Sequence, residues 1–368
     1  MDGARGIGPA AGDWHQTYVT GREHPADDSA GRPAGRRRRP PGALAILIAA
    51  ALLSGCGKQS PLNPHSPQAS DIATLWWGML IAAAIVFFGA VGLLLLAWLR
   101  RDKAGLPVFG ESERAANGLV IGFGMVVPIV VLVVLFAISD VYVIGKTEAP
   151  APGSTDLTID VTGHQWFWEV RYPGTHAVTA NEIHIPVDTR VAVVARTKDV
   201  IHSFWVPELN RKVDMIPGRA NRVLLYADRP GVYRGQCSEF CGLQHAHMAM
   251  KVFADPPGRF RAWLANMSEP TPAPTTAGQR RGEQVFMDHA CASCHTLRGT
   301  DARGDVGPDL THLATRSSLA ADTIPNSPAY LAEWVADPQH VKPGNRMPGL
   351  RFSDADFQAL LDYLQSRR

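Results

Sequence analysis

The chain lacks several features by which common protein classes are recognised. Its formal net charge is only +2 at pH 7, which argues against nucleic-acid binding, because proteins of that kind carry a marked basic excess. No segment resembles a nucleophilic triad or a phosphate-binding loop, so the sequence gives no support to hydrolase or nucleotide-binding chemistry. Cysteine is scarce, with five residues in a chain of 368, and each of the five therefore needs an explanation.

Two of these cysteines belong to a short run that has the composition of a copper loop. Cys237, Cys241, His245 and Met248 follow one another at spacings of four, four and three residues. Soft thiolate and thioether ligands combined with imidazole favour copper. A mononuclear site needs one cysteine, whereas two cysteines can bridge a pair of copper ions. The run therefore predicts a dinuclear copper centre suited to electron transfer.

Each copper of such a pair needs its own histidine, so a second one must come from another part of the fold. We expect it to be His202, with Met248 as a weak axial ligand of one copper and the backbone carbonyl of Glu239 serving the other. The alternatives are a zinc site, which gives the methionine no role, and a disulfide, which leaves the histidine and methionine spacing to chance.

A second pair of cysteines indicates a c-type haem. Cys291 and Cys294 are followed directly by His295, a pattern in which the cysteines hold the porphyrin covalently and the histidine binds the iron. Met347, in a loop framed by proline and glycine, is the expected second axial ligand. Met287 is the competitor, although it lies in the helix expected to lead to Cys291.

Two further segments fit a small haem domain. The turn at 307–310 is expected to orient His295 through a backbone carbonyl. Residues 352–364 have apolar side chains at helical spacing and Ser353 at the N-cap position, as a closing helix would have. A redox or zinc motif is the alternative for the isolated Cys-x-x-Cys-His pattern.

The fifth cysteine, Cys56, ends a segment with the form of a bacterial lipoprotein signal. A basic run at 36–39 precedes an apolar stretch at 43–53 and a small-residue cleavage site. We expect a signal peptide over 42–56 and lipidation of Cys56, with an uncleaved anchor as the alternative. Residues 1–41 have no apolar periodicity, so they are either disordered or the product of a misassigned start.

Two long apolar runs, 72–99 and 118–138, predict a transmembrane hairpin over 72–145, because each reaches the roughly 20 residues that cross a bilayer. The basic residues between them indicate a cytoplasmic loop by the positive-inside rule. Pro128 is expected to kink the second span. A hairpin buried in a protein core is the alternative. Trp76, Trp77 and Trp98 fall near the ends of the first run. The basic residues of the loop are Arg100, Arg101, Lys103 and Arg114.

The remaining chain divides into two domains joined by a linker. Short alternating runs over 150–265 predict an all-β Greek-key sandwich, which with the copper loop resembles a cupredoxin. A flexible Pro/Thr-rich linker is expected at 266–279, and an all-α domain of the class I cytochrome c kind at 280–368. A linker is also expected at 57–71, so the fold class is multidomain.

These motifs resemble those of subunit II of haem-copper cytochrome c oxidases, and the fused haem domain resembles the caa type. The resemblance covers 71–253 and includes the segments 163–168 and 212–219. It implies an electron-entry subunit that passes electrons from its covalent haem c to the dinuclear copper centre, called CuA, and on to subunit I. Subunit I would reduce oxygen to water and translocate protons, and subunit III would be a further partner.

The resemblance also implies roles for single residues. Trp166 matches the aromatic residue where electrons enter the copper domain, whereas Trp168 is expected in the core. The Glu239 carboxylate would bind magnesium at the boundary with subunit I, near the motif that holds Lys212 and Asp214. Many relatives carry a glutamate associated with proton uptake where this chain has Ile121. The resemblance therefore does not assign a residue of this chain to proton uptake.

Two other functions fit part of this pattern. The CuA subunit of a nitric oxide reductase would share the copper loop, although the fused cytochrome favours an oxidase. A free-standing membrane electron-transfer lipoprotein would not need the hairpin. The expected donor is a soluble cytochrome c or a membrane electron donor. The expected location is the bacterial inner membrane, with the copper and haem domains on the outer, periplasmic face.

Overall fold

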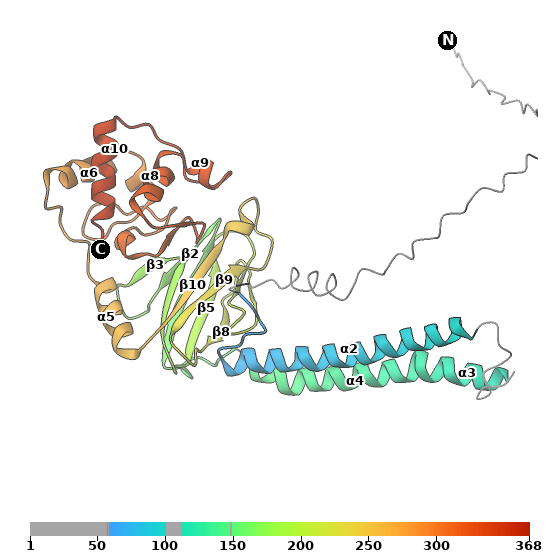
Figure 1. Cartoon of the computed structure of the whole chain (residues 1–368). Helices are drawn as coiled ribbons and strands as arrows, with labels where there is room; N and C mark the ends of the chain where they lie inside the picture. Colours follow the sequence, from blue (N-terminus) through green and yellow to red (C-terminus); the bar gives the residue numbers. More distant parts are fainter. Residues whose placement is uncertain (1–56, 58, 101–111, 148) are drawn as a thin grey trace, which may run out of the picture. The chain divides into compact units, whose positions relative to one another are not determined.

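The structure is a computed structural model that describes residues 57, 59–100, 112–147 and 149–368 (Figure 1). The predictions for residues 1–41, the signal peptide and Cys56 lie outside this part of the chain. So do Arg101 and Lys103 of the expected basic loop. The described residues form a pair of long helices, a β-sandwich and a helical domain.

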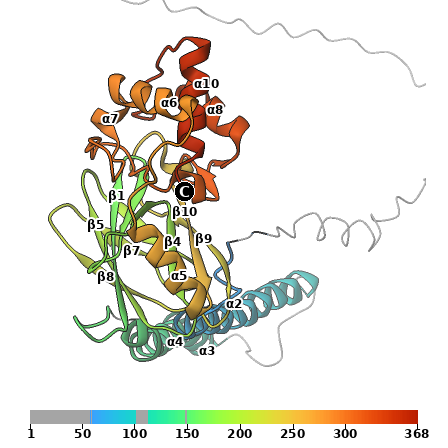
Figure 2. The same cartoon turned by 90° about the vertical axis from the view of Figure 1, so that its left-hand side faces the viewer.

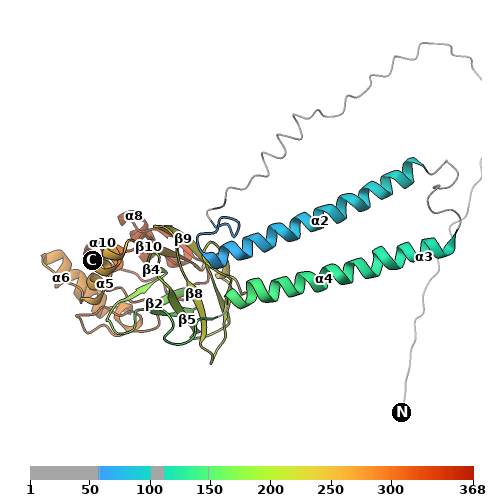
Figure 3. The same ribbon diagram turned by 90° about the horizontal axis from the view of Figure 1, so that it is seen from below.

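The two apolar runs form long helices that lie side by side (Figure 3). Both are long and apolar enough to cross a membrane, and neither has its apolar stretch buried in the protein. The helices begin earlier than predicted, because Ser66 and Ser112 cap their first turns. Pro128 lies inside the second long helix, directly after a π-helical stretch that interrupts the regular α-helical hydrogen bonding. The elements are α2 (Pro67–Leu99), α3 (Glu113–Ile121), π-helical Gly122–Val126, α4 (Val127–Ile138), π-helical Ser139–Ile144 and 3-10 helical Gly145–Thr147.

Both long helices are tied to one short segment of the sandwich, residues 209–211. At the start of α2, the Ser66 hydroxyl donates to the carbonyl of Leu209. At the end of the second helix, Arg211 Nε donates to the carbonyl of Thr147 at 3.0 Å. The hairpin therefore has two attachments to the sandwich besides the chain itself.

The sandwich consists of two five-stranded sheets (Figures 1 and 2). One has the strand order β3-β2-β1-β5-β8 and the other β4-β10-β9-β6-β7. Each sheet contains one parallel pair, β1 with β5 and β4 with β10, so strands distant in sequence are neighbours. The strands are β1 (Leu157–His164), β2 (Phe167–Arg171), β3 (Val178–Ala180), β4 (Glu182–Pro186), β5 (Val191–Thr197), β6 (His202–Trp205), β7 (Val213–Met215), β8 (Asn221–Leu225), β9 (Gly231–Cys237) and β10 (Ala249–Asp255).

Alternating apolar residues of both sheets form one core between them. Trp168 is fully buried there, as predicted, and its ring lies edge-on to Phe204 at 6.1 Å. Cys237, Cys241 and Met248 belong to the same cluster of buried residues. The predicted copper ligands are thus attached to the rigid part of the sandwich and not to a loose loop.

Helix α5 (Pro257–Ser268) follows the last strand and packs on β3, β4 and β10. Its Trp263 stacks on the ring of His184 at 4.0 Å. The predicted boundary at 265 is therefore three residues too early, because the helix continues to Ser268.

The C-terminal domain is helical. Helices α6 and α10 pack against each other around a core that includes Phe286 and Tyr363. The closing helix is confirmed as α10, and the Ser353 hydroxyl caps it by accepting from the amide of Asp356 at 3.2 Å. The elements are α6 (Ala277–Asp288), α7 (Cys291–Cys294), 3-10 helical Leu313–Thr315, β11 (Ser318–Leu319), β12 (Ile324–Pro325), α8 (Pro328–Ala336), α9 (Pro338–Val341) and α10 (Asp354–Gln365).

The connection between the two domains is shorter and more ordered than the flexible linker predicted at 266–279. Helices take both ends of that range and leave 269–276. Arg298 donates to the carbonyls of Met267 and Ser268 at 2.6 and 2.9 Å. Arg367 donates to the hydroxyl of Thr271 at 2.9 Å. The prediction of a free tether is wrong, because polar side chains of the haem domain bind the connecting backbone.

Candidate metal and haem sites

Two neighbouring strands and the loop after one of them place the predicted copper ligands. His202 begins β6, Cys237 ends β9, and the two strands pair beside each other with Phe204 opposite Cys237. The amide of Cys237 donates to the carbonyl of Met248 at 3.0 Å. This bond closes the loop that holds Cys241 and His245. The strand pairing therefore brings His202 to the copper loop across a gap of 35 residues.

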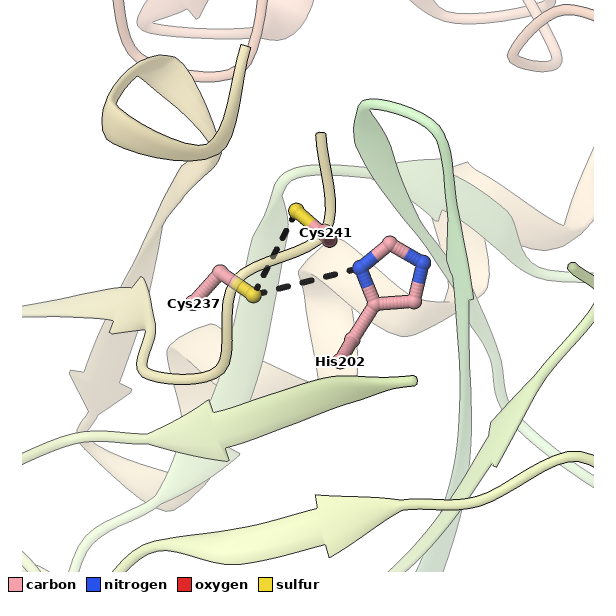
Figure 4. A group of neighbouring side chains, drawn as sticks. All are labelled: His202, Cys237 and Cys241. Carbon is pink, nitrogen blue, oxygen red and sulfur yellow. Dashed lines mark hydrogen bonds between the residues drawn. The ribbon is translucent and has the colours of Figure 1, made fainter. Parts of the chain in front are cut away.

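Figure 4 shows three of these residues, His202, Cys237 and Cys241, whose ligand atoms all lie within 4.8 Å of one another. Cys237 Sγ lies 3.8 Å from Cys241 Sγ, 3.9 Å from His202 Nδ1 and 3.2 Å from the carbonyl oxygen of Glu239. Cys241 Sγ lies 3.6 Å from His245 Nδ1 and 3.8 Å from Met248 Sδ. All six predicted ligands are therefore together, with the two sulfurs in the middle.

This geometry separates the alternatives. The two cysteines are free thiols 3.8 Å apart, so the disulfide alternative does not apply. Met248 is fully buried with its sulfur toward Cys241, and a zinc site would leave that thioether without a function. The donor set of two sulfurs, two imidazoles, a thioether and a carbonyl fits a copper pair.

Asp199, which the sequence analysis did not single out, orients His202. Its carboxylate lies 2.8 Å from His202 Nε2 and accepts from the amide of Gln165 at 2.7 Å. Burial opposes the charged imidazole, but hydrogen bonds with Asp199 and Cys237 outweigh it and raise the pKa of His202. The carboxylate fixes the ring so that Nδ1 faces the sulfurs, as carboxylate partners of metal-binding histidines do.

The two thiols lie within hydrogen-bonding distance of each other, and this contact shifts their pKa values in opposite directions. The hydrogen bond from Cys241, together with that of His202, lowers the pKa of Cys237, whereas donating that bond raises the pKa of Cys241. A bound metal ion removes both protons, because thiolates are the ligating form. Copper binding to this cluster is therefore expected to release protons.

The haem motif occupies the short helix α7 and the residue after it. Among the predicted haem residues, His295 Nδ1 lies 2.8 Å from the carbonyl oxygen of Pro308. This confirms the role predicted for the turn at 307–310. A Cβ on Gly307 would lie 2.5 Å from the His295 ring, so glycine is required there. Burial lowers the pKa of His295 and keeps the neutral, metal-binding form.

A cavity bordered by the haem motif has the lining that a haem needs. Cys291, Cys294, His295 and Met347 all line it, whereas Met287 lies in α6 and packs against the helical core. The cavity therefore favours Met347 over Met287 as the axial ligand. Apolar groups dominate the rest of the wall: Phe286, Leu310, Leu313, Leu331, Trp334, Val335, Leu360 and Leu364.

Arg316 is a buried charged residue in this wall. It is 6% exposed, it donates to the Asp309 carbonyl, and its Nε has no hydrogen-bond partner among the described residues. A buried guanidinium group with a spare donor needs an anion. The carboxylates of a haem are such groups, so the residues present fit the cofactor.

Trp166 lies between the two sites. It occupies the turn between β1 and β2 and not a strand. Its indole Nε1 donates to the carbonyl of Cys241 at 3.0 Å, and the Gln165 side chain donates to the same oxygen at 2.8 Å. Trp166 also lines the cavity that contains His295.

Glu239 and its neighbours lie at an exposed corner of the copper loop. Lys212 Nζ lies 3.8 Å from the Glu239 carboxylate and 3.9 Å from that of Asp214. These side chains are about half exposed. The contacts are surface ion pairs, which contribute little to stability.

Comparison with known proteins identifies the family. The model for "Cytochrome C oxidase subunit II, periplasmic domain" matches residues 175–254, and that for "Cytochrome c" matches 279–368. Cytochrome c oxidase subunit 2 of Alkalihalophilus pseudofirmus is 34% identical over 333 residues, which cover 88% of this chain and 96% of that protein. The chain belongs to the cytochrome c oxidase subunit II family. The subunit II of Bacillus subtilis is 27% identical over 349 residues, with 88% and 96% covered.

Among solved structures, the periplasmic domain of subunit II of cytochrome oxidase from Bradyrhizobium japonicum is similar. It is 32% identical and covers 33% of this chain and 96% of its own, with a TM-score of 0.31.

Family membership confirms the predicted architecture of a subunit II with a fused cytochrome c domain. It implies a CuA centre in the sandwich and haem c in the helical domain, and the two apolar helices anchor the subunit in a membrane. The subunit is part of an oxidoreductase and has subunit I as a partner. Several residues around the sites were missed in the sequence, although Asp199 stands three residues before His202 and Lys342 begins the methionine loop (residues 342–347).

Proposed function

We propose that this subunit II receives electrons at the haem of its C-terminal domain and delivers them through its copper loop to subunit I, where oxygen is reduced to water. In this proposal His295 and Met347 bind the haem iron, and Cys291 and Cys294 hold the porphyrin. The copper pair is bound by His202, Cys237, Cys241, His245, Met248 and the carbonyl of Glu239.

The position of Trp166 is the observation that carries this proposal. Its ring borders the haem cavity, and its indole N–H bonds to the backbone of Cys241, a predicted bridging ligand. The exposed aromatic expected at the electron entry is therefore turned toward the subunit's own haem domain. A separate donor would then reduce the haem and would not need to reach Trp166.

Each cofactor supplies one-electron redox chemistry when it is bound, and the protein determines its environment. Around the copper loop, Asp199 and the Cys237 amide bond hold the ligands in place before any metal binds. A preformed site changes little on electron uptake, which favours rapid transfer. In the haem cavity, the Pro308 carbonyl orients His295, and apolar walls exclude water and raise the reduction potential.

Purification of the intact complex with an optical spectrum and gas-uptake assays tests this function. Co-purified a-type haem and oxygen consumption that falls by at least tenfold in Trp166→Leu, with both cofactors retained, support the proposal. Co-purified b-type haem with nitric oxide reduction would identify the rival reductase instead. Wild-type turnover in Trp166→Leu would contradict the route through this side chain.

We propose a more specific location and set of partners than family membership implies. We place the subunit in the bacterial inner membrane beside subunits I and III, with lipidation at Cys56 and with Glu239 offering its carboxylate to magnesium at the subunit I boundary. Mass spectrometry of the membrane form checks lipidation, and an intact peptide spanning 53–58 in the mature protein would contradict it. The donor is proposed to be a soluble cytochrome c or a membrane-bound electron carrier.

A further inference from the structure

Lys342 is the most deeply buried lysine at the contact between the two domains. Its side chain is 3% exposed, although it carries an amino group that is normally in water. The amino group donates to the carbonyl of Trp166 at 2.9 Å and to that of Ala320 at 3.1 Å. Burial lowers the pKa of Lys342 to about 7. Burying an amino group costs free energy, and the two hydrogen bonds offset part of that cost.

The backbone around Lys342 connects directly to the predicted haem ligand. The side chain of Asn345 donates to the carbonyl of Lys342 at 2.7 Å and accepts from the amide of Met347 at 2.7 Å. Gln339 donates to the carbonyls of Asn345 and Met347 at 2.9 and 3.0 Å. The methionine loop is therefore internally rigid, so a force on Lys342 is transmitted to Met347.

The other end of this connection reaches the copper loop. Trp166 accepts from Lys342 through its carbonyl and donates through its indole to Cys241. An unbroken path of hydrogen bonds and covalent backbone thus runs from Met347 through Asn345, Lys342 and Trp166 to Cys241. Every step of it is 3.0 Å or shorter.

Other contacts between the two domains surround this central one. The methionine loop also meets the copper domain where Arg346 donates to Gln165 and Gln244 donates to the carbonyl of Pro343. Lys198 pairs with Asp305 at 3.7 Å at the rim, where both side chains are largely exposed. Such a rim pair contributes little. At another edge of the contact, buried Glu182 accepts from the amide and the hydroxyl of Ser317, both at 2.6 Å. The Lys342 bonds differ from these because they join the methionine loop to Trp166.

We propose that Lys342 is a positioning residue, which fixes the methionine loop of the haem domain against Trp166 and so holds the haem domain in one orientation on the copper domain. The proposal deepens the proposed function and rests on it for its use in electron transfer. The occupant of the surface around Trp166 is the chain's own haem domain. Lys342 acts through the two carbonyls and does not itself carry the electron.

The first test uses the unmodified holo-oxidase. Native protein is labelled briefly with an amine-specific reagent, and each lysine is quantified by mass spectrometry. We expect Lys342 to react at least tenfold more slowly than Lys198, which is about two-thirds exposed. Labelling of Lys342 as fast as that of Lys198 would overturn the proposal, because an undocked loop would expose the amino group.

The second test uses Lys342→Met in the holo-oxidase, which keeps the length of the side chain but removes its donors, with Lys198→Met as the matched control. Loss of a buried hydrogen-bonded donor typically weakens an interaction by about tenfold or more. In Lys342→Met we expect the backbone amides of residues 339–347 to exchange their hydrogens at least tenfold faster. We expect electron transfer from haem to copper to be at least tenfold slower. Neither should change in Lys198→Met. The absorption of methionine-ligated haem should persist, because the Asn345 bonds remain.

The readouts separate two kinds of failure. Wild-type exchange and wild-type transfer in Lys342→Met would overturn the positioning role. Slow labelling of Lys342 in a wild-type protein that shows no haem-to-copper transfer would leave the positioning in place. The proposed electron route would then be the part that failed.

Discussion

The closest contact between two helices of the haem domain occurs at Gly282, and it gives a quantitative prediction for Gly282→Ala. A Cβ there would lie 2.0 Å from the Ala359 carbonyl oxygen and 2.6 Å from Tyr363 Cβ. Ordinary contact begins at 3.4 Å, so α6 and α10 would have to separate by more than an ångström. The clash is with backbone, which cannot rotate away.

Overpacking a core costs about 1–3 kcal/mol, and a backbone clash belongs at the upper end. Alanine regains about 1 kcal/mol of helix propensity relative to glycine. The net loss is therefore about 2 kcal/mol. For a domain of this size, 1 kcal/mol corresponds to about 4–8 °C in Tm, so we expect the haem domain of Gly282→Ala to melt about 8–16 °C lower.

The assay is thermal unfolding of the intact subunit followed by haem absorbance, with the copper absorption as an internal reference for the other domain. Gly278→Ala in the same helix is the matched control, because its Cβ would make only ordinary contacts with side chains, 3.4 Å from the Asp362 carboxylate and 3.9 Å from the Thr276 hydroxyl. That variant should melt at or slightly above the wild-type temperature. A Gly282→Ala protein that is as stable as wild type would refute the close packing of α6 and α10.

Three further predictions concern the sites. Gly307→Ala should displace the His295 ring, since the new Cβ would lie 2.5 Å from it, and should shift the haem potential and spectrum; Gly349→Ala, with nothing within 4 Å, should change neither. Met248→Leu should keep two coppers and shift their potential, whereas Cys237→Ser should abolish the pair; metal analysis and electron paramagnetic resonance distinguish these, and a wild-type potential in Met248→Leu would argue against axial ligation. Because burial lowers the pKa of Lys342 from 10.5 to about 7, the unfolded chain binds the extra proton between these values. Stability in urea should therefore rise as pH rises from 7 to 10.5 and stay flat below 7 with respect to this group; an unchanged pH slope in Lys342→Met would contradict this.

The parts of the fold that follow from local pattern could be predicted from the sequence. Helix α10 combines helical periodicity with a serine cap, and strands such as β5 have enough alternating residues to be recognised. Strands such as β3 and β7 could not be recognised individually, because they have only three residues each. A pattern of that length does not distinguish a strand from a loop.

The candidate sites divide in the same way. Motif spacing was enough to name the copper and haem ligands, because metals require particular donor atoms in a fixed geometry. Asp199, Arg316 and Lys342 were not found, because their importance arises from what tertiary packing places around them. A lysine before a Pro-Gly turn gives no sign that the residue is buried, with its amino group bonded to the Trp166 carbonyl. Only the folded chain reveals such burial.

The double attachment of the helical hairpin at residues 209–211 has a mechanical consequence. A domain held by a single strand of chain can swivel about it, whereas one held through both Leu209 and Arg211 resists torsion. The metal ligands lie on the same sandwich, so they are also restrained against rotation relative to the hairpin. Their height and tilt above the bilayer are then set by covalent and hydrogen-bond geometry.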